Sequence, residues 1–275
     1  MTAMTHIYVV GYPKSGNTWL TRMIARATRF PVKTPDGSQP EVAADVNREI
    51  ERIKGVEEGS VFKLHEMPNI FEGRLIREAG KQDTKVVYIY RDVGDVFISS
   101  FFYFKHNGIE RYIKKPSDFM SFFNPMWLAK RVFWRIQFNR YLGSFIHHGY
   151  NKEAVTYANH LSAWFAYLKN CDGKFDYVVT KYEDLIDDPV HELERICNRI
   201  GFHDLDIGLL ESTVKSESFS DRKKAIERAS DELTFGKEFN IKFLRTGKAS
   251  DYKRFLTKGQ AMRLQKAVQN IVNQH

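Results

Sequence analysis

Short apolar segments alternate with longer amphipathic ones along this chain. Segments rich in β-branched and aromatic residues, each bounded by turn-forming residues, predict four strands at 6–10, 60–65, 85–90 and 176–180. Apolar residues three and four positions apart predict helices that begin near Asn17, cover 95–104, run from Pro189 to a cap at Gly201, and cover about 259–273. Strands that alternate with helices predict an α/β fold, a single domain over 1–275 with a central, mainly parallel sheet flanked by helices.

Four candidate functional residues follow the predicted strands directly. In open parallel sheets, ligands bind beyond the carboxyl ends of the strands. At or just past such ends lie Lys14, His65, Arg91 and Tyr182. We therefore expect these side chains to gather at one edge of the sheet.

The loop after the first predicted strand nearly matches a phosphate-binding pattern. Its sequence from Gly11 to Thr18, GYPKSGNT, departs from GxxxxGK[ST] because the lysine has moved from position 17 to Lys14. Backbone N–H groups of such a loop, with the positive end of the following helix, attract phosphate. No carboxylate for Mg²⁺ is evident, although Asp92 follows the third strand. We predict a 5′-phosphate site without a metal, in which Lys14 faces a reacting oxygen; a tight turn with a surface lysine is the structural alternative.

Composition and charge narrow the class of protein. The chain of 275 residues is 43% hydrophobic and 28% charged, which is ordinary for a globular protein and speaks against disorder. A formal net charge of +8 suits an anionic partner, but Lys and Arg are dispersed, without the run typical of a nucleic-acid tail. The two cysteines have no CxxC spacing, which favours a reducing compartment. Without a signal peptide or about 20 consecutive apolar residues, we expect a cytoplasmic protein with no membrane anchor and no nucleic-acid partner.

Residues 12–19, YPKSGNTW, resemble the 5′-phosphosulfate loop of the cytosolic-type sulfotransferase family. Members of that family use 3′-phosphoadenosine 5′-phosphosulfate (PAPS) as the sulfuryl donor. The usual form of the loop there is YPKSGTTW, so only Asn17 differs. The resemblance extends from residue 7 to about 257. It implies a fold like that of the P-loop nucleoside triphosphate hydrolases, PAPS as co-substrate, 3′-phosphoadenosine 5′-phosphate (PAP) as product, and no metal.

The resemblance also implies which residues bind the donor. From the phosphosulfate loop these are Lys14, Ser15, Gly16, Asn17, Thr18 and Trp19. For the 3′-phosphate they are an arginine fork and a hydroxyl eight residues apart, Arg91 and Ser99. The segment 245–253, RTGKASDYK, is similar to the family's RKGxxGDWK motif and adds Arg245, Thr246 and Gly247. Further nucleotide contacts are implied for Tyr182, Ser218 and Phe219, with the adenine between Trp19 and Phe219. The structural alternatives for these residues are packing and helix capping.

A catalytic role is implied for three residues. The segment 62–65, FKLH, resembles the family's Lys-x-His segment, in which the histidine is the general base. The acceptor would attack the sulfur of PAPS in line while His65 removes its proton, a role worth about 10²–10⁴-fold in rate. Lys14 and Lys63 would stabilise negative charge on the transferring group.

Two long segments have less specific interpretations. Residues 104–150 are unusually aromatic, with basic residues interleaved. They could form a helical core with a basic outer face, a lid over the acceptor site for a planar or cationic acceptor, or a membrane-surface contact. We expect Trp164 to border the same acceptor pocket, and we expect the polar and basic residues 203–257 to form loops that cap the nucleotide. After Phe255 the family's dimerisation segment is not recognisable, which leaves the oligomeric state open.

The predicted function is transfer of a sulfuryl group from PAPS to a hydroxyl or amine of a small molecule, including natural products of secondary metabolism. Three alternatives remain. A P-loop kinase or nucleoside triphosphatase would require ATP and Mg²⁺. A non-catalytic nucleotide- or nucleic-acid-binding module would not need His65. A carbohydrate sulfotransferase would usually sit behind a membrane anchor.

Overall fold

The computed structural model describes residues 4–34, 43–52, 59–78, 82–104, 125–150, 155–171, 173–228 and 247–272. The chain divides into two compact units. The sheet unit comprises Met1–Arg91 and Ala163–Leu244, and the helical unit comprises Asp92–Ser162 and Arg245–His275. That one domain spans both units stays a prediction.

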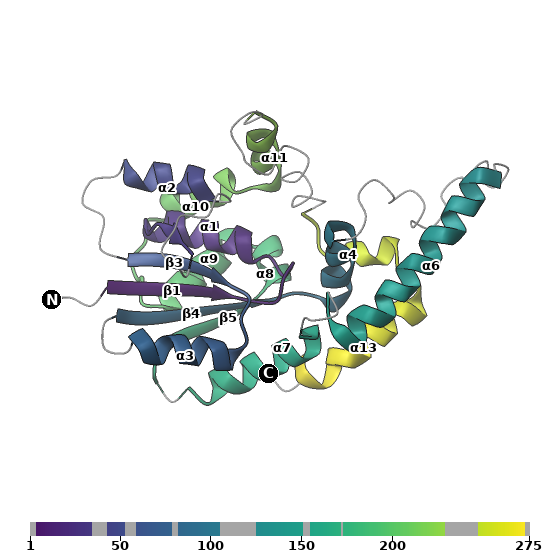
Figure 1. Ribbon diagram of the computed structural model, residues 1–275. Helices are drawn as coiled ribbons and strands as arrows, with labels where there is room; N and C mark the ends of the chain where they lie inside the picture. Colours follow the sequence, from purple (N-terminus) through teal and green to yellow (C-terminus); the bar gives the residue numbers. More distant parts are fainter. Residues whose placement is uncertain are drawn as a thin grey trace. The chain divides into compact units, whose positions relative to one another are not determined.

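Five strands form the sheet, in the order β2-β3-β1-β4-β5 (Figure 1). Their bounds are β1 Met4–Val10, β2 Val32–Lys33, β3 Gly59–Leu64, β4 Gln82–Tyr90 and β5 Asp176–Lys181. All neighbouring strands run parallel, which confirms the predicted sheet. Because Val10 of β1 pairs with Leu64 of β3 and with Tyr88 of β4, the carboxyl ends of the central strands lie at one edge. The two-residue strand β2 was not predicted because it is too short to show a periodic pattern.

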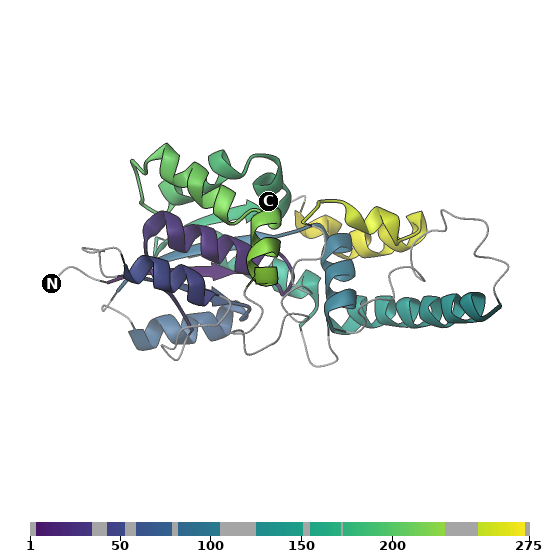
Figure 2. The same ribbon diagram turned by 90° about the horizontal axis from the view of Figure 1, so that it is seen from above.

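Helices cover both faces of the sheet (Figure 1). One face carries α1 Asn17–Thr28, α2 Ala44–Glu51, α9 Pro189–Arg199 and α10 Ile207–Ser216. Seen from above, α1 in purple lies between α2 and the green helices α9 and α10 (Figure 2). The other face carries α3 Pro68–Glu78 and, from residue 163 on, α7 Tyr157–Lys169. Two further helices follow β5 and α10 directly, α8 Tyr182–Asp187 and α11 Phe219–Arg228.

The central strand is buried on both sides, which explains its unbroken apolar sequence. Ile7 and Val9 belong to the core beneath α1 and α9. Tyr8 points to the opposite face, where its ring meets that of Phe71 in α3 at 5.2 Å. Cys197 of α9 is buried in the first of these cores, and burial raises the pKa of its thiol to about 12.

The prediction that residues 203–257 form loops is wrong in part, because α10 and α11 are helices. Their ends are capped by side chains. The carboxylate of Asp206 accepts a hydrogen bond from the backbone N–H of Leu209 at 2.8 Å, and the hydroxyl of Ser218 accepts one from that of Asp221 at 3.2 Å. Weak apolar periodicity hid these helices, and Arg222 of α11, which looks like a surface residue in the sequence, is partnered by Asp45 of α2.

The helical unit contains α4 Val93–Phe104, α6 Pro125–His148, the start of α7, the 3₁₀ turn η3 Asp251–Arg254, and α13 Lys258–Val272. Its core is aromatic. The ring of Phe97 in α4 packs against those of Phe138 and Phe145 in α6, at 5.1 and 5.4 Å. In α13, Leu264 and Val268 are buried, whereas Ile271 is half-buried.

Candidate functional site

The loop that joins β1 to α1 has a backbone that requires glycine. Gly16 precedes α1 with a φ of 107°, and Lys14 also has a left-handed φ of 75°. A Cβ atom on Gly11 would lie 2.3 Å from the carbonyl oxygen of Ile89 in β4, and one on Gly16 would lie 2.5 Å from the ring of Tyr182. Helix α1 starts without a side-chain cap and without an acidic residue in its first turn. Its positive end therefore suits an anion, and phosphate binding by this loop stays a prediction.

Asn17 ties this loop to the neighbouring strand β3. Its side chain is buried, and Nδ2 donates to the carbonyl oxygens of Gly11 at 2.8 Å and of Leu64 at 3.3 Å. The side chain thus turns inward, toward the backbone of the loop and of β3. The backbone N–H of Asn17 remains the predicted contact to the phosphate.

His65 follows β3 and meets the same loop. Its Nδ1 lies 2.7 Å from the carbonyl oxygen of Gly11, which can only accept, so Nδ1 carries the proton and Nε2 keeps its lone pair. The contact of 3.2 Å between Nδ1 and Nδ2 of Asn17 then joins two donors that share one acceptor. Loss of hydration lowers the pKa of His65 to about 4, a shift to which the positive charges of Lys63 and Lys14 also contribute.

Lys63, the other predicted catalytic residue of this segment, lies on β3 two positions before His65. Its Nζ donates to the hydroxyl of Thr18 in the first turn of α1, at 3.3 Å. Burial lowers the pKa of Lys63. The structure therefore brings Lys63, Thr18, Asn17 and His65 together around the start of α1.

Arg91 and Tyr182 follow the next two strands and contact each other. The guanidinium carbon of Arg91 lies 4.0 Å from the centroid of the Tyr182 ring, a cation–π contact. Tyr182 also packs edge-on against Trp19, with ring centroids 5.7 Å apart, and lies against Gly16. The sheet edge thus holds residues from the ends of β1, β3, β4 and β5, as predicted.

The predicted adenine contacts lie on α1 and at the joint between α10 and α11. The indole N–H of Trp19 donates to the carbonyl oxygen of Glu217 at 3.0 Å. Ser218 caps α11, and Phe219 is the first residue of that helix and is half-buried. Trp19, Ser218 and Phe219 are therefore near one another, although their contact with adenine stays a prediction.

The remaining predicted donor residues belong to the helical unit. Ser99 lies on α4 and is half-buried, and Gly247 has a left-handed φ of 60°. Arg245 and Thr246 lie outside the described residues. The fully buried carboxylate of Asp95 in α4 accepts hydrogen bonds from the backbone N–H groups of Ser250, at 2.7 Å, and Tyr252, at 2.9 Å. This contact attaches the segment after Gly247 to the helix that carries Ser99.

The aromatic segment is partly helical core. Phe138 and Phe145 are buried, whereas Phe133 is 52% exposed, and residues 105–124 lie outside the described part of the chain. The expectation that Trp164 borders an acceptor pocket is wrong. Its ring is fully buried, stacks on that of Tyr88 at 5.6 Å, and donates from Nε1 to the carbonyl oxygen of Glu66 at 2.9 Å. Spacing on a helix could not distinguish a core face from a pocket face.

Sequence reasoning missed a group of ion pairs that joins α1 to the α10–α11 joint. Its signal was present as paired basic residues on α1, Arg22 and Arg26, which a surface helix would leave in solvent.

Among the described residues, no group of three or more His, Cys, Asp or Glu side chains could hold a metal ion. Nor does any helix in the described ranges combine the length and apolar character needed to cross a membrane.

Comparison with known proteins identifies the family. The sulfotransferase domain model matches residues 4–274. The chain belongs to the sulfotransferase domain family. This sulfotransferase-family chain is 25% identical to sulfotransferase 2A1 of Macaca fascicularis over 274 residues, which cover 96% of the chain and 82% of the relative. It is 21% identical to flavonol 3-sulfotransferase of Flaveria bidentis over 280 residues, or 95% and 80% of the two proteins.

A solved structure shows the same fold. The crystal structure of mouse sulfotransferase SULT7A1 complexed with PAP aligns with 98% of this chain and 84% of its own, with a TM-score of 0.62 and 20% identity. These matches confirm the family and enzyme class predicted from the motifs. They also confirm the predicted fold class, a central parallel sheet flanked by helices as in P-loop proteins.

Proposed function

We propose that this protein transfers a sulfuryl group from PAPS to a hydroxyl or amine of a small molecule and releases PAP. The observation that carries the proposal is the convergence of Lys63 and His65 on the glycine-bounded loop before α1, whose helix end is uncapped. The family match supports sulfuryl transfer, and the PAP complex of the mouse relative supports PAPS as donor.

In this proposal the backbone N–H groups of Ser15 to Thr18 bind the 5′-phosphate, and Arg91 binds the 3′-phosphate. Both lie at the carboxyl edge of the sheet, where the β1–α1 loop supplies N–H groups and the guanidinium supplies a fork. The parts played by Ser99, Arg245, Thr246 and Gly247 stay predictions from the sequence.

The chemistry follows from the protonation state of His65. Because Nδ1 donates to Gly11, Nε2 is free to take the proton of the acceptor. The acceptor oxygen or nitrogen forms a bond to sulfur, the bond from sulfur to the bridging oxygen breaks, and PAP leaves with that electron pair. Lys14 and Lys63 stabilise negative charge on the transferring group and the leaving oxygen.

The acceptor class is the least specified part of the proposal. Relatives with names as different as sulfotransferase 2A1 and flavonol 4′-sulfotransferase match over more than nine-tenths of this chain, so overall similarity does not select an acceptor. We propose a small hydroxyl or amine compound, including products of secondary metabolism. A cytoplasmic location is also part of the proposal, supported by the 25% identity to cytosolic sulfotransferase 1 of Danio rerio.

Isothermal titration with PAP and with ATP, each with Mg²⁺ and with EDTA, tests the donor. We expect PAP to bind equally well in both buffers, and ATP to bind more weakly in both. Lys14→Met should weaken PAP binding, whereas Lys174→Met, which changes an exposed lysine paired with Glu72, should not. Preference for ATP with Mg²⁺ would replace this proposal with the kinase alternative. Labelled PAPS with a panel of phenols, alcohols and amines then identifies the acceptor.

A further inference from the structure

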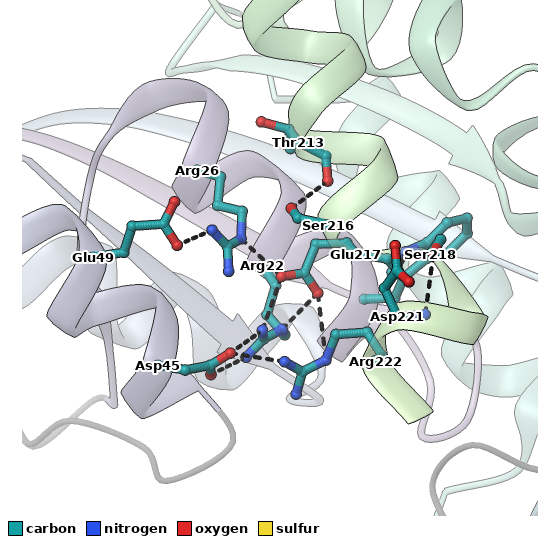
Figure 3. Close-up of polar contacts among 11 residues, drawn as sticks. Arg22, Arg26, Asp45, Glu49, Thr213, Ser216, Glu217, Ser218, Asp221 and Arg222 are labelled. Atoms are coloured by element: carbon teal, nitrogen blue, oxygen red, sulfur yellow. Dashed lines mark hydrogen bonds and ion pairs between the residues drawn. The ribbon is translucent and has the colours of Figure 1, made fainter. Parts of the chain in front are cut away.

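An ion cluster joins α1, α2 and the α10–α11 joint (Figure 3). Its members are three arginines and three carboxylates, namely Arg22, Arg26, Asp45, Glu49, Glu217 and Arg222. At the centre, the guanidinium of Arg22 donates to both carboxylate oxygens of Glu217, at 2.7 and 2.8 Å. It also donates to both carboxylate oxygens of Asp45, at 2.7 and 2.8 Å. One arginine thus makes two forked contacts, which fix its plane and the positions of both partners.

Two further arginines close the cluster. Arg26, one helical turn after Arg22, donates to Glu217 at 2.8 Å and pairs with Glu49. Arg222 of α11 donates to Asp45 at 2.7 Å. Glu217 is therefore attached to α1 through two arginines, and α11 is attached to α2 through Asp45.

The centre of the cluster is buried and its rim is exposed. The side chain of Glu217 is 0% exposed and that of Arg22 is 3% exposed, whereas Asp45 is 43% exposed. Burial alone would lower the pKa of Arg22, but its hydrogen bonds to Asp45 and Glu217 outweigh this effect and raise it. Desolvation offsets most of the attraction in a buried ion pair, so such a pair contributes little net stability. The forked hydrogen bonds of Arg22 instead fix the relative positions of Asp45 and Glu217, which two apolar side chains in contact would not do.

The geometry holds two parts of the proposed donor site at a set spacing. Glu217 immediately precedes Ser218 and Phe219, and its carbonyl oxygen accepts the hydrogen bond from Trp19. The joint is thus attached to α1 twice, through its carboxylate and through its backbone. Helix α1 begins at the phosphate loop, so the hydrogen bonds between α1 and Glu217 connect that loop to the α10–α11 joint.

We infer that Arg22 and Glu217 are positioning residues for the donor nucleotide, which set the distance between the phosphate loop and the adenine contacts Ser218 and Phe219. This inference rests on the proposed function. Neither side chain reaches the reacting atoms in this assignment, because both face the ion cluster between helices. Their loss should weaken nucleotide binding in the ground and transition states alike, which raises KM for PAPS and leaves kcat unchanged.

Three variants and one matched control test the inference. Glu217→Gln removes the charge, Arg22→Lys keeps the charge but loses the fork, and Arg26→Lys replaces the guanidinium whose Nε donates to Glu217 at 2.8 Å. The control is Glu192→Gln, since Glu192 is also a buried carboxylate of the sheet unit, held by Thr180 at 2.6 Å and by Arg195 at 2.6 Å. Urea unfolding gives the stability of each variant, and titration at a temperature where each is folded gives the Kd for PAP.

We expect at least a tenfold increase in Kd for Glu217→Gln and Arg22→Lys, a smaller increase for Arg26→Lys, and less than a twofold change for the control. Unchanged affinity in the folded Glu217 and Arg22 variants would overturn the inference, and Arg26→Lys, at the rim of the cluster, decides the matter if those two do not fold. An equal loss in the control would assign the effect to general stability and would also overturn it. A folded wild-type protein that binds no PAP would instead remove the proposed function, and this inference with it.

Discussion

His65 should keep a neutral ring in mildly acidic solution. Loss of hydration beside the loop lowers its pKa, the positive charges of Lys63 and Lys14 act in the same direction, and the hydrogen bond to Gly11 opposes them. The balance is a pKa of about 4, against an ordinary value of 6.5.

The difference in neutral fraction between His65 and an ordinary histidine is large enough to measure. At pH 5.5 a histidine with its ordinary pKa would be only about one-tenth neutral, whereas a pKa near 4 leaves more than about nine-tenths neutral. Because the folded pKa lies below the unfolded one, the folded state binds fewer protons between about pH 4 and 6.5. The stability linked to the neutral ring is therefore complete above about pH 6.5 and is lost as the pH falls toward 4.

Two-dimensional NMR of the histidine rings tests this without any acceptor. The His65 signal is assigned by its loss in His65→Gln, and its midpoint is followed from pH 4 to 8. We expect a midpoint well below 6.5, a neutral tautomer protonated at Nδ1, and an upward shift of the midpoint in Lys63→Met. Lys85→Met is the control, since Lys85 pairs with Asp176, the first residue of β5, at the end of that strand away from the loop. A wild-type midpoint at or above 6.5, or a proton on Nε2, would refute the assignment of His65 as a base poised by the loop.

Three further changes probe the loop and its surroundings. Gly11→Ala would place a methyl group 2.3 Å from the carbonyl of Ile89, so we expect about 1–3 kcal/mol of destabilisation and weaker PAP binding, whereas Gly73→Ala, with nothing within 4 Å, should not destabilise in urea unfolding. Asn17→Thr restores the family's usual residue but loses hydrogen bonds to two backbone carbonyls, and should lower the unfolding free energy by about 1 kcal/mol; an unchanged Tm would contradict this. Asp95→Ala leaves two backbone N–H groups near η3 without their acceptor, so urea unfolding should show a loss of about 2–3 kcal/mol, and a loss below about 0.5 kcal/mol would count against the assigned contact.

The sheet and the edge that carries the site could be predicted because both depend on local sequence. Strands buried on both faces are short and continuously apolar, as in residues 7–10, and parallel strands place their carboxyl ends at one edge. That rule alone predicts that Lys14, His65, Arg91 and Tyr182 lie at the same edge of the sheet. The cation–π contact between Arg91 and Tyr182 then follows from the pairing of β4 with β5.

The parts that sequence reasoning missed depend on partners far away in the chain. In the sequence, helix α11 looks like a polar surface segment. In the structure its Arg222 donates a hydrogen bond to Asp45, 177 residues away. Glu217 likewise looks like a surface residue, although α1 buries its carboxylate with two arginines. The prediction that Trp164 borders a pocket was wrong for the opposite reason. Its spacing on the helix did not indicate that the ring of Tyr88 would cover its own ring. Charge and aromaticity mark such residues, but only the fold decides which face they occupy.

The role of Asn17 bears on the choice between sulfuryl and phosphoryl transfer. In a P-loop triphosphatase this position carries the lysine that reaches the β- and γ-phosphates. Here the side chain is buried and both of its donor contacts go to backbone carbonyls, those of Gly11 and Leu64. It cannot serve a triphosphate from that position, so in the proposed function positive charge for the donor comes from Lys14 within the loop and from Lys63 and Arg91 beside it. The carbonyl oxygen of Gly11 accepts one hydrogen bond from Asn17 and one from His65. Asn17, the residue that differs from the family's usual loop, therefore shares a hydrogen-bond acceptor with the proposed base.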